Sequence, residues 1–90
     1  MTKEKQKIII SLKKAKSLTE KLIEMTNKGE YCISIMQQNL AAIGLLKSAH
    51  QMLMEGHLNS CFKNAMASKN EKLKQKMVGE ILKVNKLANK

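Results

Sequence analysis

Two cysteines and a histidine are the residues of this 90-residue chain whose types and spacing suit metal chemistry. His57 and Cys61 are four residues apart, so a helix would place the imidazole and the thiol on one face. Together with Cys32 they form a soft ligand set, which suits Cu(I) or Zn(II) and not Mg(II) or Ca(II). Because structural zinc normally takes four ligands, three ligands without an evident fourth favour three-coordinate Cu(I).

The spacing alone leaves a second interpretation open. His57 can be a histidine on a helix surface, and both cysteines can be small residues of a core. Two cysteines in a cytosolic chain are nevertheless more often metal ligands or redox-active thiols than a structural disulfide. The two cysteines therefore indicate a functional role, but their types and spacing do not determine which one.

Apolar residues recur at helical steps along most of the chain, which predicts an all-α fold. We expect one helix over about 4–27, a long central helix over about 30–67 and a third over about 71–88. Gly29 ends the first helix, as glycine commonly does just past a helix C-terminus. Residues 1–90 are then a single three-helix domain.

The length of the central helix separates the candidate ligands. Cys32 precedes His57 by 25 residues, which is about 37 Å along a helix. One chain cannot close the site, but a second copy can. If two long helices pack antiparallel around a two-fold axis near Leu45 and Leu46, Cys32 of one protomer lies beside His57 and Cys61 of the other.

Composition supports a small helical oligomer. The chain has no proline, four glycines and two aromatic residues, which is unlike a β-sandwich or barrel. Hydrophobic residues make up 43% of it, and seven are methionine. This is more apolar surface than one short helical chain covers, so we expect copies to associate.

Positive charge is concentrated at the two ends of the chain. The formal net charge is +10, divided as +5 over residues 1–28, −1 over residues 29–61 and +6 over residues 62–90. Such a distribution suits nucleic acid as the partner, or less readily anionic lipid. Every basic residue is lysine and every acidic residue is glutamate, so composition bias is the alternative explanation.

Several functions are not expected from this sequence. Ile8 to Leu12 is too short an apolar run for a signal or membrane-spanning segment, so the protein is expected to be cytoplasmic, without a membrane partner. No catalytic set of nucleophile, base and orienting group can be assembled, because aspartate is absent and His50 is interpreted as a helix-surface residue. An enzyme with a small-molecule substrate is therefore not expected.

A family resemblance rests on the same residues. The segments Tyr31-Cys32 and His57-Leu58-Asn59-Ser60-Cys61-Phe62, with Met36-Gln37-Gln38 and Ala41-Ala42-Ile43 between them, resemble the copper-sensing repressor family of the CsoR/RcnR type. The resemblance implies antiparallel dimers of three-helix protomers, built as four-helix bundles, that assemble into disc-like tetramers. It also implies operator DNA binding by the metal-free form. Cu(I) at Cys32 of one protomer and at His57 and Cys61 of the other would release the DNA and derepress copper resistance genes.

The resemblance also assigns residues around the metal. Tyr31 matches a tyrosine that supports the ligands, and the family's supporting glutamate falls on Met77 without a gap or on Glu80 if the preceding loop is three residues longer. We favour Glu80. The nickel branch has a further N-terminal histidine and a histidine in place of Cys61, and this chain has neither.

The first helix departs from the family pattern. The family carries arginines there, whereas this chain has none and reads Ser11-Leu12-Lys13-Lys14-Ala15-Lys16-Ser17. Lysine neutralises phosphate but lacks the bidentate fork of arginine. The candidate DNA contacts are Lys5, Lys7, Lys13, Lys14, Lys16 and Lys47. Two alternatives stay open: a persulfide or thiol sensor using Cys32 and Cys61, and a copper-binding paralogue that does not bind DNA.

Overall fold

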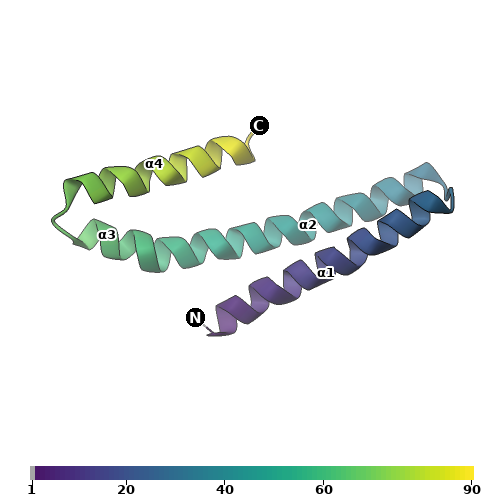
Figure 1. Ribbon diagram of the computed structural model, residues 1–90, viewed down its shortest axis with the longest axis horizontal. Helices are drawn as coiled ribbons and strands as arrows, with labels where there is room; N and C mark the ends of the chain where they lie inside the picture. The colour runs from purple at the N-terminus through teal and green to yellow at the C-terminus, as the bar shows by residue number, and fades with distance from the viewer. Residues whose placement is uncertain (1) are drawn as a thin grey trace. The chain divides into compact units, whose positions relative to one another are not determined.

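Most of the described residues are helical in the computed structural model, which describes residues 2–90 apart from the side chain of Thr2 (Figure 1). No strand occurs among these residues, so the predicted all-α class is confirmed. The chain forms two units, one ending at Gly56 and the other spanning His57–Lys90. The elements in chain order are α1 (Thr2–Asn27), α2 (Cys32–His57), the π-helical segment η1 (Leu58–Phe62), α3 (Lys63–Ala67) and α4 (Glu71–Ala88).

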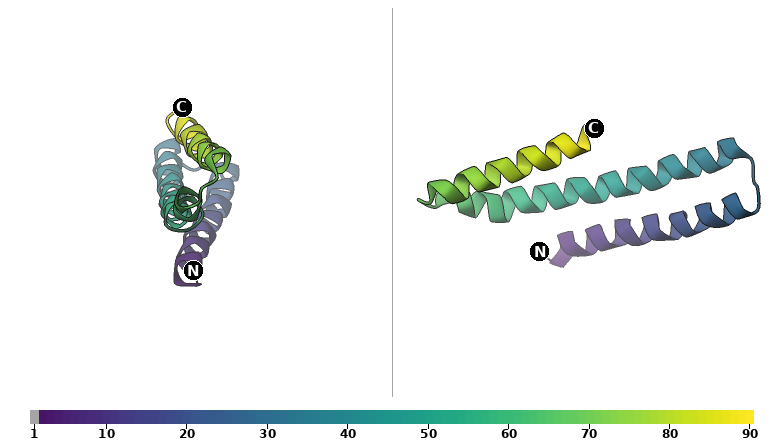
Figure 2. Two further views of the ribbon diagram at one scale, coloured as in Figure 1. Left: turned by 90° about the vertical axis from the view of Figure 1, so that its left-hand side faces the viewer. Right: turned by 45° about the horizontal axis from the view of Figure 1, so that its top comes forward.

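The first unit is a helical hairpin in which α1 runs antiparallel to α2 (Figures 1 and 2). Small residues form the contact between the two helices, because alanine and serine allow helix backbones to approach closely. The Ser11 hydroxyl donates a hydrogen bond of 2.8 Å to the carbonyl oxygen of Leu45. The buried residues of this unit are Ser11, Ala15, Met25, Ala42 and Ala49.

The turn between α1 and α2 is built around Gly29. Its φ of 67° lies in the left-handed region that glycine adopts without a steric penalty. The Gly29 N–H donates to the Thr26 carbonyl at 3.1 Å and the Glu30 N–H donates to the Met25 carbonyl at 3.1 Å, which is the Schellman arrangement. Glu30 and Tyr31 are therefore not helical, and the second helix begins at Cys32 rather than near residue 30.

Replacing Gly29 by alanine is expected to lower the free energy of unfolding by about 1–2 kcal/mol, because a Cβ is disfavoured in the left-handed region. A Cβ at this position meets no atom within 4 Å, so the whole effect comes from the backbone. Gly79→Ala is the matched control. Its Cβ also meets nothing within 4 Å, but Gly79 lies inside α4, where alanine should stabilise by about 0.5–1 kcal/mol. Urea unfolding followed by circular dichroism distinguishes the two signs.

The middle of the chain remains helical from Cys32 to Ala67 but is not one uniform α-helix. His57, Phe62 and Lys63 all have right-handed helical backbone angles, and Leu58–Phe62 between them forms a π-helical turn. A π-helical turn has hydrogen bonds from i to i+5 and is rare outside short bulges. The expected helix over about 30–67 is thus divided into α2, η1 and α3.

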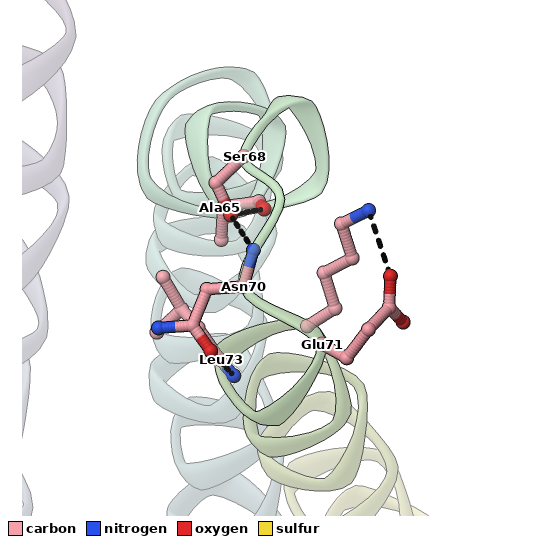
Figure 3. A network of polar contacts seen from close by, with 6 residues as sticks. Ala65, Ser68, Asn70, Glu71 and Leu73 are labelled. Atoms are coloured by element: carbon pink, nitrogen blue, oxygen red, sulfur yellow. Dashed lines mark hydrogen bonds and ion pairs between the residues drawn. The ribbon is translucent and has the colours of Figure 1, made fainter.

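The second unit contains η1, α3 and α4, joined by a turn whose polar groups cap both helices (Figure 3). The Ser68 hydroxyl donates to the Ala65 carbonyl at 2.6 Å and accepts from the Asn70 N–H at 3.3 Å. The Asn70 side-chain oxygen accepts from the Leu73 N–H at 3.1 Å, which is the usual N-cap bond. These bonds end α3 at Ala67 and start α4 at Glu71.

A single chain leaves most of its large apolar side chains exposed. No large side chain is fully buried among the described residues, and most of the exposed ones lie on α1, α2 and α4. On α2 they include Ile33, Met36, Leu40, Ile43, Leu46 and Leu53. Extended apolar surface of this kind usually marks an interaction site. Among the described helices, none combines the length and the apolar character needed to cross a bilayer.

Candidate functional site

Cys32 is placed at the start of α2 by the turn that Gly29 makes possible. It is the first residue of the helix, and the Tyr31 carbonyl just before it accepts from the Ile35 N–H at 3.2 Å. The thiol is free and exposed.

His57 and Cys61 occupy the other end of α2. His57 is its last residue and is half-buried, while Cys61 lies within η1 with a free, exposed thiol. The Ser60 hydroxyl contacts the Cys61 sulfur at 3.9 Å. The π-helical turn therefore coincides with the segment that links the two candidate ligands, and π-helical turns frequently occur at functional sites.

The three candidate ligands do not meet within one chain. Among residues 2–90, no three side chains of histidine, cysteine, aspartate or glutamate lie close enough together to hold a metal ion. Helix α2 has 26 residues, of which Cys32 is the first and His57 is the last. Each end of this helix consequently presents an incomplete set of soft ligands.

The two supporting residues lie on different elements. Tyr31 is in the turn before α2 and is 70% exposed. Glu80 is exposed on α4, and Met77, the position given by an ungapped alignment, is half-buried on the same helix. Neither Tyr31 nor Glu80 is enclosed by the other described residues.

The six candidate DNA contacts are all exposed. Five are on α1 and the sixth, Lys47, is on α2. Lys13 and Lys14 border a shallow groove on α1, together with Lys21, around the apolar side chains of Ile10 and Leu18. The sign of the charge along α1 is mostly positive. Near its start, Glu4 has a pKa below the usual range because its backbone hydrogen bond stabilises the carboxylate.

The structure defines a small all-helical protein with candidate soft metal ligands at or next to the two ends of α2 and lysines along its first helix. The sequence profile of the family described as metal-sensitive transcriptional repressor matches residues 4–86. The chain belongs to this family, and the resemblance carried by Tyr31, Cys32, His57 and Cys61 is confirmed at the level of the family.

Several relatives carry the name copper-sensing transcriptional repressor CsoR, and three of them illustrate the similarity. The protein of Mycobacterium ulcerans (strain Agy99) is 29% identical over 66 residues. Those of Mycobacterium bovis (strain BCG / Pasteur 1173P2) and Mycobacterium tuberculosis (strain ATCC 25618 / H37Rv) are each 26% identical over 66 residues. Each alignment covers 73% of this chain and 56% of the relative, so the chain matches little more than half the length of these proteins. No solved structure matches the chain significantly.

Proposed function

We propose that this protein is a Cu(I)-responsive transcriptional repressor whose metal site is shared between two protomers. The observation that carries this proposal is the placement of Cys32 at one end of α2 and of His57 and Cys61 at the other end and just beyond it. A second copy packed antiparallel along α2 brings Cys32 of one protomer to His57 and Cys61 of its partner. The two-fold axis then generates two equivalent sites.

The exposed apolar side chains of α2 support this arrangement. Leu46 is 49% exposed and Ile43 is 40% exposed near the middle of the helix, where the two-fold axis is expected. Packing two copies of α2 against each other removes the exposed part of these side chains from water, and each then contributes about half of the 1.5–3 kcal/mol that full burial of a leucine or isoleucine gives. The homodimer is a four-helix bundle of the two hairpins, and two dimers form the disc-like homotetramer.

The chemistry of the ligands selects the metal. Two thiolates and one imidazole suit Cu(I), and three ligands match its preference for low coordination number better than that of structural zinc. The three relatives named above are called copper-sensing, which agrees with this choice. Tyr31 and Glu80 would connect to the free ring nitrogen of His57, so that metal binding alters helix packing.

The metal-free protein would bind operator DNA through the lysines of α1 and Lys47. Phosphate contacts by lysine supply affinity through charge, while sequence must be recognised by other groups or by DNA shape. Cu(I) binding would release the DNA and derepress copper resistance genes. The protein would act in the cytoplasm, as a regulator and not as an enzyme, without a small-molecule substrate.

The experiment is a fluorescence-anisotropy titration of the reduced, metal-free protein onto DNA from upstream of its own gene. We expect binding at moderate salt that is reversed by one Cu(I) per protomer, and the same affinity with or without Cu(I) for the Cys61→Ser variant. Absence of binding at low salt would contradict the repressor function. Tight Cu(I) binding without any DNA binding would instead favour the copper-binding paralogue, which the absence of arginine motivates.

The lysine assignment is tested in the same assay by varying the salt concentration. Lys13→Gln, Lys14→Gln and Lys16→Gln together should reduce the slope of log K against log salt by about 0.9 for each phosphate that the variant no longer neutralises. The matched control replaces Lys76, Lys83 and Lys86 of α4, which are also exposed, and makes the same change in net charge. Equal slopes for the two triple variants would show that the basic surface acts only through total charge.

A thiol sensor is the second candidate, because both thiols are free and exposed. In the proposed dimer, Cys32 and Cys61 of different protomers are close enough to be linked through sulfur. Mass spectrometry after persulfide treatment would show crosslinked protomers if this candidate is correct. Unmodified thiols under those conditions would dismiss it.

A further inference from the structure

We propose that His50 and Met54 form a second, weaker site for a soft monovalent cation on α2. The site is separate from Cys32, His57 and Cys61, and its ligands are an imidazole nitrogen and a thioether sulfur. The proposal depends on the proposed function only in taking Cu(I) as the natural ion, because the ligand pair itself belongs to one chain.

Position on the helix brings the two side chains together. His50 and Met54 are four residues apart inside α2, where side chains at this spacing are neighbours with Cβ atoms about 5–6 Å apart. Within one chain His50 is exposed and Met54 is half-buried. Ala49, the residue before His50, is buried. Successive residues of an α-helix are rotated by about 100° around its axis, so His50 is on a different side of α2 from the buried Ala49.

The pattern involves every histidine of the chain. His50, Met54 and His57 follow one another along α2 at steps of four and three residues, which keeps them on one face of the helix. The chain contains two histidines, and both are in this series. His50 is exposed on α2, as expected for a helix-surface residue, and its spacing from Met54 places a second soft ligand beside it.

The ligand chemistry fits a soft ion and sets the order of the two affinities. Thioether and imidazole groups both suit Cu(I), whereas hard divalent cations prefer oxygen ligands. The pair has no thiolate, and the ammonium group of Lys47 is one turn away, so it should bind more weakly than a site with two thiolates. Cu(I) held by the pair would be one helical turn from His57, which the proposed repressor site uses.

The test uses the full chain with Cys32→Ser, His57→Gln and Cys61→Ser, which removes the ligands of the proposed repressor site. Ag(I) serves as the probe, because it is a soft monovalent ion that is stable in air. We expect saturation at one Ag(I) per protomer, with NMR shifts at the His50 ring and the Met54 methyl group. Adding His50→Gln or Met54→Leu should weaken binding by at least about tenfold, since either change leaves a single soft ligand.

Met36→Leu is the matched control. Met36 is 51% exposed on the same helix, but no histidine lies one turn from it. An Ag(I) shift at Met36 as large as that at Met54, or affinity unchanged by His50→Gln, would overturn the proposal. If the triple variant does not fold, the Ag(I) titration is made on wild-type protein whose proposed repressor site is first filled with one Cu(I) per protomer. Absence of Cu(I)-dependent DNA release in the wild-type protein, together with Ag(I) binding by the triple variant, would count against the repressor function alone.

Discussion

Mixing two inactive variants should restore Cu(I) binding. Cys32→Ser retains His57 and Cys61, whereas the double variant His57→Gln/Cys61→Ser retains Cys32. Each variant alone should lose at least about 100-fold in Cu(I) affinity, because even changes to groups that only support metal ligands cost 10–100-fold. A heterodimer of the two has one complete site and one without any ligand, because each site takes Cys32 from one protomer and the other ligands from the second.

The expected amount of recovery follows from the symmetry. If subunits exchange freely at equal concentration, half of the dimers are mixed. Each mixed dimer has one complete site out of two, so about a quarter of the wild-type number of sites returns. Competition with a chromophoric Cu(I) chelator measures this fraction. If no Cu(I) binding returns even after the two variants are refolded together, the shared site is contradicted. Ser60→Ala is the control, because it removes the hydroxyl that contacts the Cys61 sulfur and leaves all three ligands in place.

Features that depend on local chain chemistry can be predicted from the sequence. Gly29 marks the end of the first helix because its left-handed conformation is a property of glycine itself. The separation of Cys32 from His57 follows from the rise of a helix. The polar segment between residues 67 and 71 likewise marks the gap in which Ser68 and Asn70 cap the neighbouring helices.

Other features have no comparable local signal. The π-helical turn at Leu58–Phe62 adds a residue to one turn without glycine or proline inside it, so helical periodicity passes through the segment unmarked. The second helix, expected from about residue 30, begins at Cys32, because a backbone pattern, the Schellman motif, decides where the chain becomes helical again. The completed metal site depends on a second chain, and the spacing of Cys32, His57 and Cys61 only shows that one chain does not suffice.

Leu46→Lys should convert the protein to a monomer and remove most of its cooperative unfolding. Leu46 is 49% exposed in one chain and lies where the two-fold axis of the proposed dimer is expected, so the Leu46 side chains of the two protomers face each other. Because about half of each Leu46 side chain is already covered in one chain, removing the two leucines forfeits about 1.5–3 kcal/mol, which raises the dissociation constant of the dimer by about 10- to 150-fold. Two lysines near the axis add mutual repulsion. Sedimentation equilibrium at micromolar concentration measures the change in mass.

The loss of cooperativity has a separate physical cause. The described residues of one chain bury alanines, a serine and Met25, and no large side chain is fully buried, so the hairpin alone has little core to lose on unfolding. Thermal unfolding of Leu46→Lys should therefore be broad, while wild-type protein should melt sharply and at a temperature that rises with concentration. Leu87→Lys, at a 59% exposed position near the end of α4, is the control and should leave mass and melting unchanged. A wild-type protein that is monomeric and still melts sharply would show that the exposed face of α2 does not need a second copy.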